Sequence, residues 1–264
     1  MRRLLCAALI LFSAAGLAQT PPSSTTWSEL LHQHVRIVNG GHASQMDYAG
    51  MQHDHARLDA YTRSLSAVTP AQFGQWDHHQ QMAFLINAYN AFTVQLVLTR
   101  WPQLDSIKDL GSLFSSPWKK EFLTLLGQRS DLDQIESRLR GKAYADPRVH
   151  FALNCASIGC PMLRAKAYVG DRLDLQLDDA LNRFLADHSR NRYDPASGTL
   201  KVSKIFDWYA DDFQQTSYHS VTGLLALHAT PLSDDPKVVA RIRAQQFGID
   251  YLPYNWHLNG TATP

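Results

Sequence analysis

The spacing of apolar residues along the chain predicts a mainly helical protein, and the clearest helix runs from Asp77 to Arg100. Its apolar positions recur every three or four residues, as on one face of a helix: Met82, Leu85, Ile86, Tyr89, Phe92, Leu96 and Val97. Phe84 and Ala88 widen this stripe, so we expect the helix to lie at the centre of the fold. Trp101-Pro102 ends it, because the residue before a proline avoids the helical conformation.

The same spacing, together with capping residues, predicts shorter helices on both sides of the central one. The first follows the capping-box sequence Thr26-Trp27-Ser28-Glu29 and is broken at Val38-Asn39-Gly40-Gly41. The others are expected around 58–65, from Pro70, after Ser130-Asp131, over 173–185, after Ser203, over 221–228 and over 236–247. Residues 191–198 are expected to form a loop.

Three segments have the composition of strands: 122–126, 149–153 and 249–258. The second is expected to enter a turn at Ser157-Ile158-Gly159. These elements predict an α+β fold, a single domain with a mostly helical shell around a small, mainly antiparallel sheet. We expect the domain to span 27–259, after a flexible lead-in at 19–26 and before a short tail at 260–264.

The first eighteen residues have the pattern of a secretory signal peptide. Arg2 and Arg3 precede a short apolar run, and small residues lead up to Ala18. The run is too short to cross a bilayer, and no later segment approaches the ~18 apolar residues of a transmembrane helix. We therefore expect a periplasmic or secreted protein with no transmembrane segment in the mature chain.

The charge of the mature chain argues against a nucleic-acid partner. Loss of Arg2 and Arg3 reduces the 25 Lys and Arg residues to 23, against 24 Asp and Glu. This balance provides no basic surplus to bind a phosphate backbone. The expected partner is a small-molecule or peptide substrate.

Two cysteines, Cys155 and Cys160, remain once Cys6 leaves with the signal peptide. They lie in the densest cluster of chemically active residues, Arg148-Val149-His150-Phe151-Ala152-Leu153-Asn154-Cys155-Ala156-Ser157-Ile158-Gly159-Cys160-Pro161. In an oxidising compartment a close pair of cysteines is most often a disulfide. A thiol enzyme is the alternative, because a cysteine beside a base is a strong nucleophile.

Several motifs in a fixed order make the sequence resemble a known family. They are Phe84-Leu85-Ile86-Asn87-Ala88-Tyr89-Asn90-Ala91, Ser106-Ile107-Lys108, Pro117-Trp118, Ile135-Glu136, the cluster from Arg148 to Pro161, Asp211-Asp212-Phe213 and Tyr254-Asn255-Trp256-His257-Leu258-Asn259. This order resembles the family called domain of unknown function 547, from about Trp27 to Asn259. Asn255 departs from the aspartate expected there. The resemblance implies an exported bacterial domain and supplies no established reaction.

The leading hypothesis is a cysteine-dependent hydrolase or acyl transferase acting on an amide or thioester. Cys155 would attack, His150 would act as the base, and Glu136 would orient the imidazole. Asn154 and the backbone amides after Cys155 would stabilise the oxyanion. Asn87 would support the site indirectly; the competing interpretation is that it ties its helix to a neighbouring loop.

Geometry restricts this hypothesis. If residues 150–155 were extended, about five steps of ~3.3 Å would separate His150 from Cys155 by roughly 16 Å, with side chains on opposite faces. A pair with His150 can form only if the strand ends by about Ala152, or if the turn at 157–159 brings Cys160 back toward His150, which makes Cys160 a competing nucleophile. The order His before Cys is also the reverse of papain-like and transglutaminase-like enzymes, so a permuted relative of those folds stays open.

The alternative is a binding or scaffold domain with a structural Cys155–Cys160 disulfide. The bridge would close a small loop around Ser157 and contribute about 2 kcal/mol. Arg148 would then hold a carboxylate or phosphate on the rim. A third possibility is that the cysteine pair is redox-active.

The histidines do not predict a metal centre. His32 and His34 lie on a predicted helix, where a spacing of two does not converge on one ion. We expect no metal and no cofactor.

Overall fold

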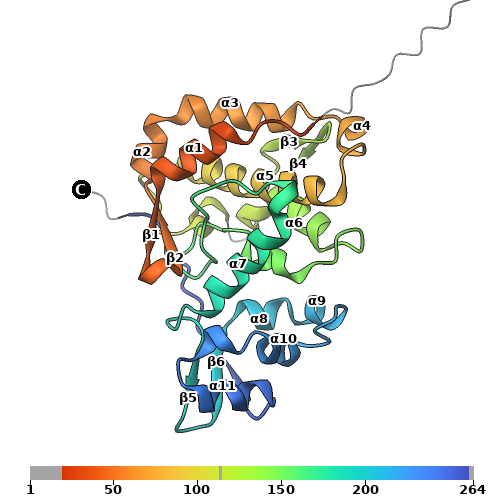
Figure 1. The fold of residues 1–264 in the computed structure, drawn as a ribbon. Coiled ribbons are helices and arrows are strands. Elements are labelled where there is room, and N and C mark those ends of the chain that lie inside the picture. Colours follow the sequence, from red (N-terminus) through yellow and green to blue (C-terminus); the bar gives the residue numbers. More distant parts are fainter. Residues whose placement is uncertain (1–19, 113–114, 262–264) are drawn as a thin grey trace, which may run out of the picture.

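The computed structural model describes residues 20–112 and 115–261, in which helices and short strands alternate (Figure 1). The α-helices are α1 Thr25–His34, α2 Tyr48–His53, α3 His55–Ser66, α4 Pro70–Phe73, α5 His78–Leu98, α6 Leu132–Arg140, α7 Leu173–Leu185, α8 Ile205–Trp208, α9 Ala210–Gln214, α10 Val221–Leu227 and α11 Pro236–Arg243. The strands are β1 Val35–Val38, β2 Ala43–Met46, β3 Leu123–Leu125, β4 Gln128–Ser130, β5 Arg192–Asp194, β6 Thr199–Ser203 and β7 Gly248–Leu252. The predicted α+β class with a mostly helical shell is confirmed.

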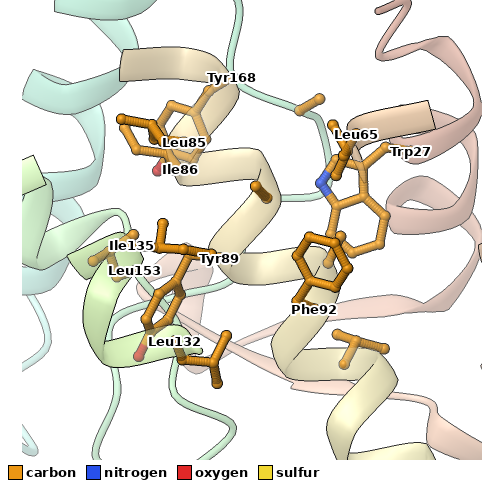
Figure 2. Packing of buried hydrophobic residues seen from close by; sticks show 14 of the residues in the cluster. Trp27, Leu65, Leu85, Ile86, Tyr89, Phe92, Leu132, Ile135, Leu153 and Tyr168 are labelled. Carbon is orange, nitrogen blue, oxygen red and sulfur yellow. The ribbon is translucent and has the colours of Figure 1, made fainter. Parts of the chain in front are cut away.

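The predicted central helix is α5, and a capping box closes its first turn. The Asp77 carboxylate accepts from the N–H of Gln80 at 2.8 Å, and the Gln80 side chain accepts from the N–H of Asp77 at 3.1 Å. Almost every side chain from Met82 to the end of the helix is buried. Figure 2 shows Tyr89 on the side of α6 and Phe92 on the side of α1, so α5 is covered from several directions.

Two hairpins lie near predicted turns. β1 and β2 pair around Asn39 and Gly40, whose φ angles are 51° and 63°. β3 and β4 pair around Leu126 and Gly127, with φ of 50° and 74°, as a tight two-residue turn requires. The first helix ends at His34, earlier than the predicted break, because the chain enters β1 there.

The expected single sheet does not form in the described part of the chain. There are two antiparallel pairs, β1–β2 and β3–β4, and a mixed sheet β5–β6–β7 in which β6 and β7 are parallel. β5 lies inside the predicted 191–198 loop, and β7 ends six residues before the predicted end of the last strand. The predicted capping box at Thr26 is also wrong, since α1 begins at Thr25 after Ser24.

The predicted strand at 149–153 is instead a 3-10 helix, Pro147–Phe151. The Asp146 carboxylate accepts from the N–H of Arg148 at 2.9 Å, and a proline suits the first helical position. These local preferences override the β-prone side chains of the segment. The helical rise is shorter than that of a strand, so His150 and Cys155 are closer along the chain than the extended estimate allowed.

Two buried apolar clusters fill the molecule. One surrounds α5; the other joins α7, α8 and α10 to the mixed sheet, which Figure 1 shows at the bottom in colours from teal to blue. The 3-10 helix connects them, because Val149 packs in the first cluster and Phe151 in the second. The residues that follow it are therefore placed at the junction of the two clusters.

The ends of the described chain refine the predicted boundaries. Thr261 donates its N–H to the carbonyl of Met46 at 3.0 Å, and Gly260 forms a bridge with the same residue, so the predicted tail begins too early. The predicted signal peptide, 1–18, lies outside the described residues. In the part that is described, no helix combines the length and apolar character needed to cross a bilayer.

We expect Asn87→Ala to destabilise the fold by about 2–4 kcal/mol, because two buried backbone groups lose their partner. Asn87 donates to the carbonyl of Tyr168 at 2.8 Å and accepts from its N–H at 2.9 Å. Urea unfolding followed by tryptophan fluorescence measures the change. Asn182→Ala, at an exposed position of α7, is the control; equal midpoints for the two variants would contradict this role.

Candidate functional site

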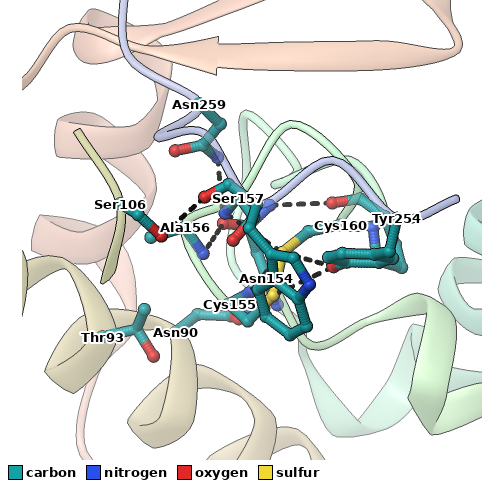
Figure 3. The surroundings of a disulfide bond; sticks show 12 residues. Asn90, Thr93, Ser106, Asn154, Cys155, Ala156, Ser157, Cys160, Tyr254 and Asn259 are labelled. Atoms are coloured by element: carbon teal, nitrogen blue, oxygen red, sulfur yellow. Dashed lines mark hydrogen bonds between the residues drawn. A yellow bond between two sulfur atoms is a disulfide. The ribbon is translucent and has the colours of Figure 1, made fainter. Parts of the chain in front are cut away.

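The two cysteines lie in a loop, residues 154–161, that pairs with a C-terminal segment, residues 253–259. The N–H of Ile158 donates to His257 O, and that of Gly159 to Asn255 O, both at 2.8 Å. In return Asn259 donates its N–H to Ala156 O at 3.0 Å. Figure 3 shows the C-terminal segment passing directly over the cysteine loop. Two pieces of chain about a hundred residues apart thus form one local structure.

Cys155 and Cys160 form a disulfide with Cα atoms 6.0 Å apart. The buried sulfur of Cys160 accepts from the backbone N–H of Cys155 at 3.0 Å and from that of Ser157 at 3.2 Å. Ala156, between the two donors, has a φ of 62°, and this left-handed conformation turns both N–H groups toward the same sulfur. The loop therefore surrounds Cys160 Sγ with hydrogen-bond donors.

Tyr254 provides a third donor from the C-terminal segment. Its hydroxyl lies 3.3 Å from Cys160 Sγ and 3.2 Å from Cys155 Sγ. The ring packs so closely on Gly159 that a Cβ there would lie 2.8 Å from three ring atoms. Burial raises the pKa of Tyr254 above its ordinary value, so its hydroxyl keeps its proton and remains a donor.

A cavity of about 300 Å³ opens beside the disulfide. Its wall combines aromatic rings, carboxylates and one sulfur, and it is lined by Tyr89, Ser116, Trp118, Asp133, Glu136, Arg140, His150, Leu153, Cys155, Pro161, Ile205, Trp208, Tyr209, Tyr254 and Trp256. Cys155 is partly exposed to this space, whereas Cys160 is only 2% exposed. An entering molecule therefore meets Cys155 first.

His150 lies in the same wall and is held by a carboxylate. Its Nε2 donates to Asp212 Oδ2 at 2.7 Å, and Arg140 donates to both oxygens of Asp212 at 2.6 and 3.2 Å. The imidazole stacks on Tyr209 with ring centres 3.8 Å apart. Among the described residues Nδ1 of His150 has no hydrogen-bond partner, which leaves it available to the cavity.

The charge of Asp212 is stabilised by these contacts. Burial opposes ionisation of Asp212, but the hydrogen bonds from His150 and Arg140 outweigh it and hold the pKa well below its usual range. Asp212 therefore stays ionised at neutral pH and fixes the imidazole in one orientation.

Glu136 was predicted to orient His150, and the structure gives this position to Asp212. Glu136 instead accepts from the hydroxyl of Tyr209 at 2.7 Å. The partner, Asp212, belongs to the Asp211-Asp212-Phe213 motif of the sequence. Because His150 and Asp212 are far apart along the chain, the sequence did not indicate that they are in contact. Burial, then the Glu136 carboxylate, raises the pKa of Tyr209.

The predicted oxyanion site at Asn154 is not formed in this structure. Asn154 donates to Pro161 O at 2.7 Å and accepts from Ala156 N at 3.0 Å and Asn259 Nδ2 at 3.1 Å. The backbone N–H groups from Cys155 to Cys160 are also occupied, by Cys160 Sγ, Asn154, His257, Asn255 and Ser157. No backbone N–H from Cys155 to Cys160 is free to stabilise a developing oxyanion.

Two other predicted site residues, Arg148 and Asn87, have structural partners. Arg148 donates to Asp146, Asp174 and Asp178, so its guanidinium is not free to hold an anionic ligand. Asn87 ties α5 to the backbone of Tyr168, away from the cavity wall.

Ser157 is buried, and its hydroxyl has no hydrogen-bond partner in the described structure. Its backbone N–H, which donates to Cys160 Sγ, is the group that belongs to the site. In the described ranges, no group of three His, Cys, Asp or Glu side chains is placed to hold a metal ion.

Fold and site together define an α+β domain with a disulfide in the wall of an aromatic cavity. A family model described as "Protein of unknown function, DUF547" matches residues 73–185. The resemblance drawn from the sequence is confirmed over that segment, which holds α5, the 3-10 helix, the disulfide loop and α7. Neither a curated protein nor a solved structure matches the chain significantly.

We expect Asp212→Asn to destabilise the protein at pH 7 by about 2 kcal/mol, because hydrogen bonds to a charged group are lost. The folded-state pKa of Asp212 lies below its unfolded value near 4. Its stabilisation is therefore present above about pH 4 and is lost as the pH falls toward the folded value. The difference between the urea midpoints of wild type and variant should therefore decrease from pH 7 to pH 4 and again to pH 2.

Asp211→Asn is the matched control, since Asp211 is the exposed neighbour on α9. A gap between wild type and Asp212→Asn that stays constant down to pH 2 would contradict the assignment.

Proposed function

We propose that this domain carries out thiol–disulfide exchange at the Cys155–Cys160 bond. One observation carries the proposal: Cys155 Sγ faces the cavity, while buried Cys160 Sγ accepts from two backbone N–H groups and the Tyr254 hydroxyl. Exchange needs one accessible sulfur and a leaving sulfur whose negative charge is stabilised. The hydrogen-bond donors are directed at Cys160 Sγ, which is the leaving sulfur in this reaction.

The reaction begins with a substrate thiolate in the cavity. Its sulfur attacks Cys155 Sγ; the new S–S bond forms, the Cys155–Cys160 bond breaks, and the electron pair remains on Cys160 as a thiolate. A second substrate thiolate then attacks the substrate sulfur of the mixed disulfide and releases Cys155. The substrate is oxidised to its disulfide, and the protein is reduced to a dithiol. The reverse sequence reduces a substrate disulfide.

His150 and Arg190 support these steps. Nδ1 of His150, with Nε2 held by Asp212, is available to take the proton of an incoming thiol. The guanidinium of Arg190 donates to the carbonyl of Cys160 and forms a salt bridge with Asp187 at 2.9 Å, so it helps to hold the residue of the leaving sulfur in position. An oxidising location, periplasmic or secreted, suits a domain whose resting state is a disulfide.

A second candidate is the cysteine-dependent hydrolase or acyl transferase, with Cys155 as nucleophile after reduction. Cys155 and the His150–Asp212 pair line the same cavity, which favours it. The occupied amides of the disulfide loop count against it, because acyl transfer needs free donors for an oxyanion. We therefore place exchange first.

We expect Tyr254→Phe to lower the equilibrium constant for reduction of the Cys155–Cys160 disulfide about tenfold. The Cys160 thiolate loses one hydrogen bond to a charged group, about 1.5 kcal/mol, which is about tenfold in an equilibrium constant. The measurement is the dithiol fraction at equilibrium with the neutral pair 2-mercaptoethanol and bis(2-hydroxyethyl) disulfide, read by alkylation and mass. Tyr251→Phe, away from the sulfurs, is the control.

A trapping experiment tests the direction of attack. Cys160→Ser should form a mixed disulfide at Cys155 with bis(2-hydroxyethyl) disulfide, and Cys155→Ser should react at Cys160 at least tenfold more slowly because that sulfur is buried. Equal rates would contradict the proposed roles. If the reduced wild type hydrolyses a model thioester and Cys155→Ser does not, the second candidate replaces the first.

A further inference from the structure

The cavity beside the disulfide has the composition of a cation-binding site. Rings from four different parts of the chain line it, among them Tyr89, Trp118, Tyr209 and Trp256. The negative face of an aromatic ring attracts a positive charge, and several rings around one space bind ammonium groups. Aromatic walls alone also suit neutral molecules, so the charges of the cavity decide its ligand.

The charges of the wall are predominantly negative. Asp133 and Glu136 make no salt bridge with any residue of the described chain, whereas Arg140 is held by Asp212. The Glu136 carboxylate also acts on the ring hydroxyls: burial, then this carboxylate, raises the pKa of Tyr89. Two carboxylates without a salt bridge therefore face this space, and Glu136 also interacts electrostatically with Arg140. An anionic ligand would enter beside these carboxylates at an electrostatic cost.

Two rings of the wall already hold cations from the protein itself. Lys108 Nζ lies 3.7 Å from the ring centre of Trp256, and the Arg140 guanidinium lies 4.9 Å from that of Tyr209. Tyr89, Trp118 and Trp208 have no such partner within the described residues. Trp118 is partly exposed and Trp208 is exposed, so their rings remain available to a cation from outside, whereas the ring of Tyr89 is buried.

We propose that the thiol or disulfide processed at Cys155 carries an ammonium group, which binds among these rings and the carboxylates of Asp133 and Glu136. This inference rests on the proposed exchange function and names the class of its substrate. The cavity volume of about 300 Å³ suits a small aminothiol or the end of a basic side chain. The ammonium would hold the sulfur of the substrate beside Cys155.

The test compares three disulfides of similar size as oxidants of the reduced protein: cystamine, bis(2-hydroxyethyl) disulfide and dithiodiglycolate. Each rate is divided by the rate of the same disulfide with dithiothreitol, which removes differences in intrinsic reactivity. We expect cystamine to exceed the neutral compound at least tenfold, and the dianion to be slowest. Glu136→Gln should reduce the preference for cystamine several-fold, and so should Asp133→Asn, which leaves the Tyr209 hydrogen bond in place.

Glu29→Gln is the control, since Glu29 is an exposed residue of α1 paired with Arg57, outside the cavity wall. It should leave the preference unchanged. Normalised rates that are equal for all three disulfides would overturn the inference and leave the exchange function standing.

Binding without chemistry separates the two proposals. The oxidised protein is titrated with n-butylammonium and with n-butanol, and fluorescence of Trp118, Trp208 and Trp256 reports occupancy. Binding of n-butylammonium alone, weakened by Glu136→Gln, supports the cation site even if exchange fails. Equal affinity for the two compounds overturns the cation site, whatever the exchange rates are.

Discussion

The pairing of the C-terminal segment with the disulfide loop is the constraint on which the site depends. The loop supplies both sulfurs, and the segment supplies Tyr254 and Trp256. Backbone hydrogen bonds in both directions set the register between them, so the position of the Tyr254 hydroxyl follows from main-chain geometry. Gly159 allows this close approach, since any side chain there would meet the tyrosine ring.

The location of the cavity follows from the two apolar clusters. α5 and α6, in the first cluster, contribute Tyr89 and Glu136; α8 and the residue after it, in the second, contribute Trp208 and Tyr209. Neither cluster alone supplies all the residues of the cavity wall. The chain from the 3-10 helix through the disulfide loop runs between them and carries His150 and Cys155, so the reactive groups lie where the two clusters meet.

The sequence alone was sufficient to predict the elements that are stabilised by interactions between residues close together in the chain. The α5 helix follows from apolar spacing, and α7 was predicted with the bounds it has. At 149–153 the β-prone composition predicted a strand. Asp146 and Pro147 favour a helical start instead, and the segment forms a 3-10 helix. The sequence also could not give the partner of His150, because only the tertiary fold brings α9 to the 3-10 helix.

The distribution of donors around the two sulfurs favours the proposed exchange over acyl transfer, the two chemistries compared above. An acyl transfer enzyme places free N–H groups where the oxyanion of its substrate forms. Here the N–H groups of the disulfide loop are occupied, two of them by Cys160 Sγ, and that sulfur is buried away from any substrate. Donors directed at a buried sulfur stabilise charge on that sulfur, and Cys160 carries such a charge only when its bond to Cys155 opens.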